Sequence, residues 1–140
     1  MKQDFSTEWR ASKNRRKQRK FIANAPLHLR GSFLNTQLSK TLSKKHGLRS
    51  IRIRKGDKVK ITTGQHKGKS GAIAKVDVKN TRVNIETLFT LKRDGSKSFY
   101  PVHPSNLQIQ ELNMDDRKRN KKLESLSKTK ETKETKDKKW

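Results

Sequence analysis

The sequence predicts a mainly β fold, a small and strongly bent SH3-like barrel that carries a basic helical N-terminal extension and a C-terminal tail. Short segments between residues 51 and 112 alternate apolar and polar side chains, as the strands of a half-buried sheet do. Glycine-rich or Asp-Gly turns separate these segments. Residues 1–50 and 113–140 are basic and poor in apolar side chains, so we expect the core to lie within residues 51–112.

Composition limits how much of the chain can be buried. Of the 140 residues, 28% are hydrophobic and 36% are charged, and the formal net charge is +24. Such a charge repels itself unless a polyanion neutralises it, so nucleic acid is the first partner to test. We expect no membrane association, because no apolar run approaches the roughly 20 residues of a spanning helix.

The chain contains no cysteine, which excludes disulfides, thiolate chemistry and cysteine-ligated zinc. Residues 1–5 lack the apolar core of a secretory signal. We therefore expect residence in the cytosol or the nucleus.

A basic helix is predicted from an N-cap at Ser12 to about Ile22. Residues 10–20 contain no acidic side chain. Their basic side chains are Arg10, Lys13, Arg15, Arg16, Lys17, Arg19 and Lys20. The segment lacks an apolar stripe, and like charges four residues apart destabilise a helix. We expect it to form fully only against phosphates; a solvated tail or a nuclear import signal is the alternative.

Two more short helices are expected before the sheet. Pro26 suits the first turn of one of them, and Gly31 should interrupt it. The next helix could be capped by Thr36 or Ser39 and would end at Gly47. We expect both helices to lie against the sheet or on RNA.

Residues 55–76 predict a strand, a glycine-rich turn and a second strand, with Val59 and Ile61 facing inward. The turn from Gly64 to Gly71 can present backbone N–H groups to phosphate oxygens. Its side chains add further donors: Gln65, His66, Lys67 and Lys69. The alternative is that the glycines only let the sheet bend while the lysines are solvated.

The next strands are predicted at residues 82–88, 89–92 and 97–100. Asp94-Gly95 favours a two-residue type I′ turn between the second and third of these strands. Prolines at positions 101 and 104 should end that run. A last strand is expected at residues 106–112, with Leu107, Ile109 and Leu112 as its inward positions.

A C-terminal helix is predicted from Arg117 to Leu126, with Asp115 and Asp116 at its N-terminus, where acidic groups are favourable. Beyond Ser127 the sequence is a low-complexity mixture of lysine, threonine and glutamate. We expect that tail to be disordered unless it is bound.

No active site is predicted. The run from Gly64 to Ser70 is one residue too short between its glycines for a P-loop, and residues 73–76 read as a strand where a P-loop needs a helix. The histidines and the acidic residues of the domain are scattered rather than grouped at ligand or catalytic spacing. We expect no catalytic residue, no metal and no cofactor.

The pattern at 55–76, GD-x-V-x-I-x-x-G-x-x-KG-x-x-G-x-I, resembles the KOW motif. Segments on either side of the motif make the resemblance more specific. They are residues 12–17 (SKNRRK), 25–30 (APLHLR), 38–40 (LSK), 49–55 (RSIRIRK) and 102–107 (VHPSNL). Together they resemble the KOW-domain family of eukaryotic large-subunit ribosomal proteins, number twenty-six in eukaryotic naming and twenty-four in bacterial naming. The resemblance covers about residues 10–125.

This resemblance implies a KOW barrel at 51–112, an rRNA-binding extension at 1–50 and a C-terminal helix and tail at 113–140. It implies a structural constituent of the large ribosomal subunit near the polypeptide exit tunnel, which joins the particle early in assembly. The expected partners are large-subunit rRNA and neighbouring ribosomal proteins, with no homo-oligomer. The expected location is the cytoplasmic ribosome, after nuclear or nucleolar transit.

The resemblance places rRNA contacts on the basic helix, on Lys55 and on the loop from Gly64 to Gly71. The family commonly has His-Tyr before the Lys-Gly of this loop, whereas the chain has Gln65-His66. We add cations on the neighbouring segments. The predicted rRNA-binding set is Arg10, Lys13, Asn14, Arg15, Arg16, Lys17, Arg19, Lys20, Arg30, Arg52, Arg54, Lys55, Lys58, Lys60, Gly64, Gln65, His66, Lys67, Gly68, Lys69 and Gly71.

Two other classes of function are weighed against this one. KOW motifs also occur in transcription elongation factors, so a transcription or ribosome-associated regulatory factor is the main alternative. Such a factor would act through protein contacts that resist nuclease. An RNA-processing enzyme is the third class, and it would need a single residue whose substitution abolishes turnover.

Overall fold

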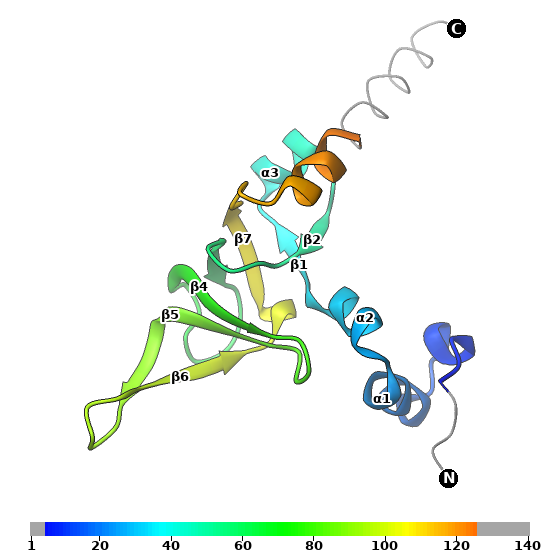
Figure 1. Cartoon of the computed structure of the whole chain (residues 1–140), viewed down its shortest axis with the longest axis horizontal. Coiled ribbons are helices and arrows are strands. Elements are labelled where there is room, and N and C mark those ends of the chain that lie inside the picture. Colours follow the sequence, from blue (N-terminus) through cyan, green and yellow to red (C-terminus); the bar gives the residue numbers. More distant parts are fainter. Residues whose placement is uncertain (1–4, 126–140) are drawn as a thin grey trace, which may run out of the picture.

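The glycine-rich hairpin lies inside a seven-stranded sheet in the computed structural model, which describes residues 5–125 (Figure 1). The strand order is β2-β1-β7-β3-β4-β5-β6. Neighbouring strands are antiparallel except for β1 and β7, which are parallel. The mainly β domain is confirmed. The strands are β1 (Asn35–Leu38), β2 (Ser50–Arg52), β3 (Lys58–Ile61), β4 (Ser70–Asp77), β5 (Arg82–Leu91), β6 (Lys97–Val102) and β7 (Leu107–Glu111).

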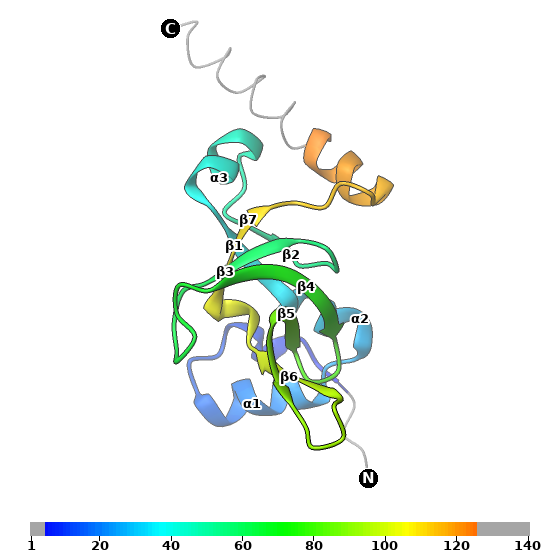
Figure 2. The same ribbon diagram turned by 90° about the vertical axis from the view of Figure 1, so that its left-hand side faces the viewer.

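The sheet is strongly bent but open. Strand β4 curves over the other strands (Figure 2), and its register against β5 shifts between Ile73 and Lys75, where an irregularity of the β-bulge kind lets a strand bend. Among the described residues, the end strands β2 and β6 do not pair with each other, so the sheet does not close.

The core lies on the inner face of this bent sheet. Val59 and Ile61 on β3, and Leu107 and Ile109 on β7, are at most 2% exposed, which confirms their predicted inward positions. Leu112 is partly buried and packs against the same cluster. The buried cluster consists of Leu34, Leu38, Ile51, Ile53, Val59, Ile61, Ile73, Val83, Ile85, Leu88, Val102, Leu107, Ile109 and Leu123.

Strand β1 was not predicted. Thr36 and Leu38 are buried, whereas Asn35 and Gln37 are exposed, so the strand has the expected alternation over four residues. It pairs with β2 on one side and with β7 on the other. The sequence reading missed it because a four-residue strand carries little periodic signal, and Thr36 looked like a helix cap.

The N-terminal helices differ in detail from the prediction. The 3-10 turn η1 (Glu8–Ala11) precedes helix α1 (Arg15–Asn24), which begins later than expected. Asn14, not Ser12, is the N-cap, because its side-chain oxygen accepts a hydrogen bond from the Arg16 N–H at 2.9 Å.

Two short helices follow, as predicted. Pro26 is the N-cap of α2 (Leu27–Arg30), and the chain continues through Gly31 into the 3-10 turn η2 (Gly31–Leu34) rather than being interrupted there. Ser39 caps α3 (Lys40–His46), accepting from the Leu42 N–H at 3.4 Å. Gly47 ends α3 with a φ of 68°, as expected for a C-terminal glycine.

The β5–β6 hairpin corrects three predictions. Residues 82–91 form one continuous strand. Strand β6 runs through Pro101. Proline has no N–H to donate, and an edge strand tolerates this because its outer side has no neighbouring strand to bond. Gly95 has a φ of 77°, whereas Asp94 has no positive φ, which excludes a type I′ turn. The Gly95 N–H donates to the Lys92 carbonyl and the Lys92 N–H to the Ser96 carbonyl, both at 3.0 Å, which is a type I turn with a glycine bulge.

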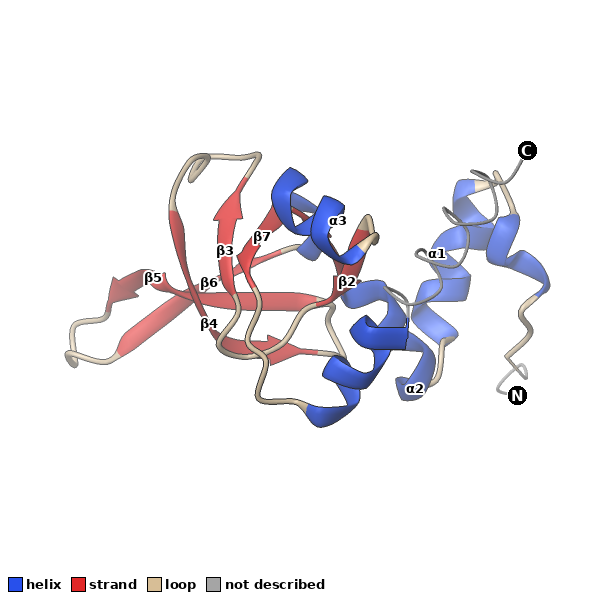
Figure 3. Cartoon of the chain, turned by 90° about the horizontal axis from the view of Figure 1, so that it is seen from above, coloured by secondary structure: helices blue, strands red, loops and turns tan. Residues whose placement is uncertain are grey.

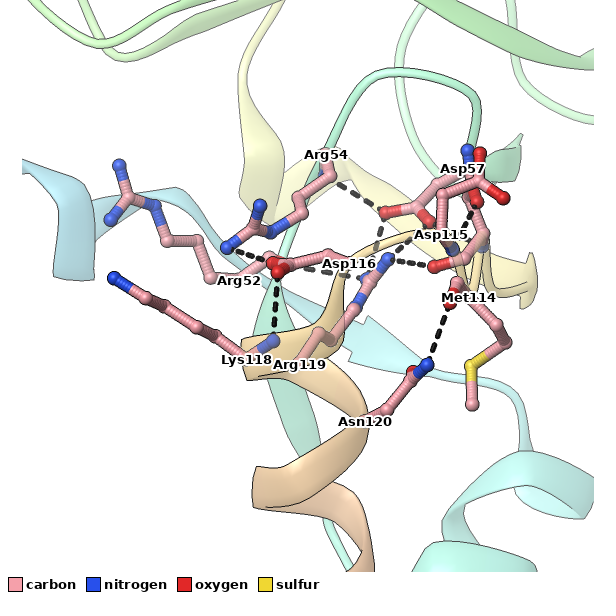
Figure 4. Close-up of polar contacts among 10 residues, drawn as sticks. Arg52, Arg54, Asp57, Met114, Asp115, Asp116, Lys118, Arg119 and Asn120 are labelled. Carbon is pink, nitrogen blue, oxygen red and sulfur yellow. Dashed lines mark hydrogen bonds and ion pairs between the residues drawn. The ribbon is translucent and has the colours of Figure 1, made fainter.

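The C-terminal segment returns to the sheet (Figure 4). Residues 117–125 are helical, and Asp116 caps them by accepting from the Lys118 N–H at 2.9 Å. Leu123 is 3% exposed and belongs to the core cluster. The 3-10 turn η3 (Pro104–Asn106) leads into β7. The predicted disordered tail lies outside the described residues.

Helix α1 and the β5–β6 hairpin lie at opposite ends of the molecule (Figures 1 and 3). Within residues 5–125, no helix is long and apolar enough to cross a membrane. The division at residues 50 and 113 stays a prediction, with β1 contributing to the sheet from the N-terminal side.

Candidate nucleic-acid interface

Exposed basic side chains cover helix α1. The helix carries no acidic residue in its first turn, and Arg10 and Lys13 before it are exposed as well. Cations four residues apart lie on one face without an opposite charge between them, so they repel one another unless an anion binds. The exposed cations of α1 are Arg15, Arg16, Lys17, Arg19 and Lys20.

Helix α1 is held by contacts that the sequence reading missed. No apolar stripe was predicted on this helix, but Phe21 is 9% exposed and its ring lies 6.0 Å from that of Phe33 in η2, measured between centroids. The Gln18 amide also fixes the preceding turn, because its nitrogen lies within 3.1 Å of the carbonyl oxygens of Trp9, Arg10 and Ser12. The Phe21–Phe33 contact therefore attaches the basic helix to η2, while Gln18 fixes the preceding turn to the helix itself.

Two predicted contact residues have structural roles. The Asn14 side chain caps α1. The Arg30 guanidinium donates to the carbonyls of Ala23, Ala25 and Lys79 at 2.6, 2.8 and 2.7 Å, which ties the end of α1 to the turn between β4 and β5. Because a guanidinium has five N–H donors, two remain for an RNA contact at Arg30.

Arg52, Arg54 and Lys55 line a groove beside β4, and Lys75 joins them from that strand. Lys75 was not predicted as a contact residue. Strict alternation would place Lys75 on the buried face with Ile73, two residues earlier, but Lys75 is exposed. The register of β4 shifts between these two residues, so alternation could not have revealed Lys75. The groove brings these cations together from two segments that are at least 20 residues apart in the sequence.

The opposite wall of this groove is acidic. The Arg54 guanidinium forms an ion pair with Asp116. Burial raises the pKa of the Asp116 carboxyl, but hydrogen bonds from the Lys118 N–H and the charge of Arg54 more than offset it, so the pKa is lower than usual. Asp116 is thus held as an anion that competes with phosphate for Arg54.

The two predicted lysines of β3 differ in their environment. Lys58 Nζ lies 2.7 Å from a Glu111 carboxylate oxygen, in an exposed pair. Lys60 is exposed, and no ion pair of its ammonium group is seen among the described residues. Lys60 is therefore the freer of the two to contact a phosphate.

The glycine-rich loop between β3 and β4 uses part of its backbone internally. The N–H groups of Lys67, Gly68 and Lys69 donate to the carbonyls of Gly64, Ile61 and His66, at 3.1, 2.9 and 3.2 Å. The expectation that the whole turn presents its N–H groups is therefore wrong for these three. No hydrogen bond from the N–H groups of residues 63–66 is seen within the described part of the chain, and residues 63–65 are exposed.

Glycine has two different functions in this loop. Gly64 and Gly68 have φ values of 96° and 90°, which favour glycine. Gly71 instead lies against β5, where a Cβ would come within 2.6 Å of the Thr87 Oγ1 atom. Packing therefore explains Gly71, and its contact with RNA stays a prediction.

The side chains of the loop are well placed for an anion. Gln65, Lys67 and Lys69 are exposed. His66 is half-buried because its ring packs edge-on against Tyr100 of β6, with centroids 5.2 Å apart. This contact was not predicted, since it joins two separate hairpins.

Potential metal ligands stay scattered within residues 5–125. The four histidines lie in separate segments, and no group of three or more potential metal ligands forms among the described residues. Residues 70–77, which follow the near-match to a P-loop, are strand β4. A P-loop is therefore excluded.

Comparison with known proteins assigns the family. The family model for the eukaryotic ribosomal proteins L26 and the archaeal ribosomal proteins L24 matches residues 12–125. The large ribosomal subunit protein uL24 of Methanosphaera stadtmanae is 44% identical over 112 residues, which cover 80% of this chain and 96% of that protein. The chain belongs to the ribosomal protein L26/L24 family. The family predicted from the sequence is thereby confirmed.

The L26/L24 match spans the structural features described above. It begins just before the Asn14 cap and ends with the helical residues 117–125, so the basic helix, the sheet and the returning C-terminal segment all belong to the matched region. Residues 1–11, which include Trp9, precede it.

Proposed function

We propose that this L26/L24 family protein is a non-catalytic, structural constituent of the large ribosomal subunit that binds and stabilises rRNA. One observation carries the proposal. The chain has 37 lysines and arginines, and the ion pairs between described residues engage Arg54, Lys58 and Arg119. A polyanion such as rRNA would neutralise the cations left over.

In this proposal, RNA contacts form along a surface with three parts. Helix α1 supplies cations from one end, the groove of Arg52, Lys55 and Lys75 supplies them from the middle, and the loop of residues 63–69 supplies backbone and side-chain donors. Such groups recognise phosphates and helix shape rather than base sequence. The protein would therefore act by fixing the fold of the rRNA that it contacts.

The same proposal covers the domain organisation, the position in the ribosome and the location in the cell. The bent sheet would act as an SH3-like KOW domain, with residues 1–50 as an rRNA-binding extension and residues 113–140 as a C-terminal helix and tail. The protein would lie near the polypeptide exit tunnel beside other ribosomal proteins and support subunit assembly and translation. It would act in the cytoplasm as a ribosomal component without a cofactor or a second copy of itself, after nucleolar transit in cells that have a nucleolus.

Salt dependence of rRNA binding tests this function. If about six phosphates or more are contacted, the affinity should fall by ~10³ or more between 50 and 200 mM salt. The measurement is the Kd for a large-subunit rRNA fragment over that salt range. An affinity that stays constant over the range would refute phosphate neutralisation as the function.

A further inference from the structure

A small pocket lies between helix α1 and residues 5–9, which we call the N-terminal arm. It encloses about 340 Å³, which is within the range of ~300–1,000 Å³ of small-ligand sites. The arm supplies one wall and α1 the other. The residues that line it are Phe5, Ser6, Glu8, Trp9, Lys20, Phe21 and Asn24.

The walls of the pocket are aromatic and its rim is polar. The rings of Phe5 and Phe21 lie 5.2 Å apart between centroids, tilted by 42°. Trp9 forms another part of the lining, and Ser6 and Asn24 add hydrogen-bonding groups to it. Aromatic faces combined with polar edges suit a flat, polar heterocycle.

The arm is folded back in the free chain. The hydrogen bonds from the Gln18 amide to the carbonyls of Trp9 and Arg10 hold the arm against α1. Phe21 in turn packs on Phe33 of η2, which connects the pocket to the rest of the domain. Because both walls are held in place, ordering this site would cost a ligand little conformational entropy on binding.

The charges around the pocket favour an anionic polymer as the occupant. The ammonium groups of Lys17 and Lys20 lie 5.5 and 5.4 Å from the centroid of the Trp9 ring. Arg10, Lys13 and Arg16, which are close in the sequence to Trp9 and Lys17, are exposed as well. A strand whose base enters the pocket would pass its phosphates over these cations, as in other sites that combine aromatic stacking with a basic groove.

We propose that this pocket holds one unstacked RNA base, which lies against Trp9 and Phe21 while Lys17 and Lys20 contact the flanking phosphates. The inference rests on the proposed rRNA-binding function and adds a base contact to phosphate contacts. The arm residues of the pocket precede the region matched by the L26/L24 family model, which begins at residue 12. The site is therefore inferred from this chain and not from its family.

Fluorescence of Trp9 tests the proposal. The chain has two tryptophans, Trp9 and Trp140, so a full-length Trp140→Phe variant leaves Trp9 as the reporter. This variant is titrated with a ten-nucleotide single-stranded oligoadenylate and, separately, with a ten-mer of abasic sugars that carries the same phosphates. We expect the oligoadenylate to quench Trp9 and to bind at least about fivefold more tightly than the abasic chain, because stacking of one base contributes ~1–3 kcal/mol.

A substitution separates stacking from charge. Trp9→Leu should reduce the preference for oligoadenylate over the abasic chain to less than about twofold, while the dependence of log Kd on log salt stays the same. Unchanged Trp9 emission together with equal affinity for both oligomers would overturn the pocket proposal and leave the proposed function standing. If neither oligomer nor an rRNA fragment bound in a salt-sensitive manner, the proposed function itself would fail.

Discussion

The Asp57 carboxylate and the Arg119 guanidinium form a buried, two-point ion pair. The Arg119 Nη1 and Nη2 atoms lie 2.6 and 2.9 Å from Asp57 Oδ1 and Oδ2, and the two side chains are 3% and 0% exposed. Asp57 also accepts from the N–H groups of Arg54 and Asn113, both at 2.8 Å. The pair therefore joins the C-terminal helical segment to the start of the glycine-rich hairpin (Figure 4).

Arg119→Met should destabilise the protein by ~3–5 kcal/mol, because it leaves the buried Asp57 carboxylate without its partner. Adding Asp57→Asn removes that charge and keeps an acceptor oxygen, so the double variant should be more stable than Arg119→Met alone. The measurement is chemical denaturation at pH 7. A double variant less stable than the single one would contradict this account.

The control for this pair is Lys58→Met. It breaks the exposed pair with Glu111, whose side chains are 59% and 65% exposed for lysine and glutamate. Exposed pairs contribute only ~0–1 kcal/mol, so the change should be small.

Gly71→Ala should destabilise the protein by ~1–3 kcal/mol through overpacking. Its Cβ would lie 2.6 and 2.8 Å from Thr87 Oγ1 and Cγ2, on the neighbouring strand β5. Part of the loss should be recovered in a Thr87→Ala background, as measured by thermal unfolding. The rest would come from Ile85 Cγ2, which the new Cβ would approach to 2.9 Å. An equal loss with and without Thr87 would show that the contact is not the cause.

Protonation of His103 should weaken the fold. Burial lowers the pKa of His103, and the charge of Arg82 lowers it further. The unfolded chain, with a histidine pKa of ~6.5, then binds more protons than the folded one, so the free energy of unfolding falls as the pH drops through that value. His103 Nδ1 also faces the Ser105 N–H at 3.3 Å, a hydrogen bond that requires a neutral ring.

The measurement is the free energy of unfolding at intervals from pH 8 to pH 5.5. His103→Asn keeps a capping acceptor and removes the titration, so the decline should be smaller. Burial also lowers the pKa of His46, and His46→Gln should reduce the decline independently. An undiminished decline in the double variant would exclude both histidines as its source.

Lys67→Gln with Lys69→Gln should weaken rRNA binding and reduce the salt slope by ~1.4–1.8, at 0.7–0.9 for each lost phosphate contact. The matched control removes the same charge from the tip of the β5–β6 hairpin, through Lys92→Gln and Arg93→Gln. Both pairs are exposed. Equal slopes for the two double variants would contradict a specific role of the glycine-rich loop.

The sequence was a good guide to the parts of the fold with a strong local signal. Alternation identified β3, the first part of β5 and β7, and Ser39 and Gly47 marked the ends of α3. The Asp94-Gly95 turn was predicted, but its glycine bulge shifts the register so that Phe89 pairs with Phe99. A one-residue difference in loop length decides which side chains meet, and composition alone does not specify it.

Contacts between residues far apart in the sequence were not predicted. Asp57 was seen only as an isolated acid among cations, because its partner lies 62 residues away. The contact of His66 with Tyr100 and the three carbonyls bound by Arg30 likewise depend on how separate hairpins and helices are packed. For the candidate interface, the sequence showed which residues are basic. It did not show which of them make ion pairs or hydrogen bonds within the protein, as Arg30, Arg54 and Lys58 do.

The central claim is that the protein is held in the large subunit by RNA contacts, with α1 as a main contributor. Removal of residues 1–24 should leave a folded sheet domain, since the core cluster begins at Leu34. Circular dichroism and thermal unfolding check that the truncated chain is folded. It should nevertheless fail to enter large subunits.

Sedimentation of the tagged full-length chain in a low-salt gradient of cell extract tests this claim most directly. We predict that the full-length chain migrates with large subunits, that nuclease releases it, and that the chain lacking residues 1–24 stays at the top of the gradient. A full-length chain that remains free of large subunits in such a gradient would contradict the account.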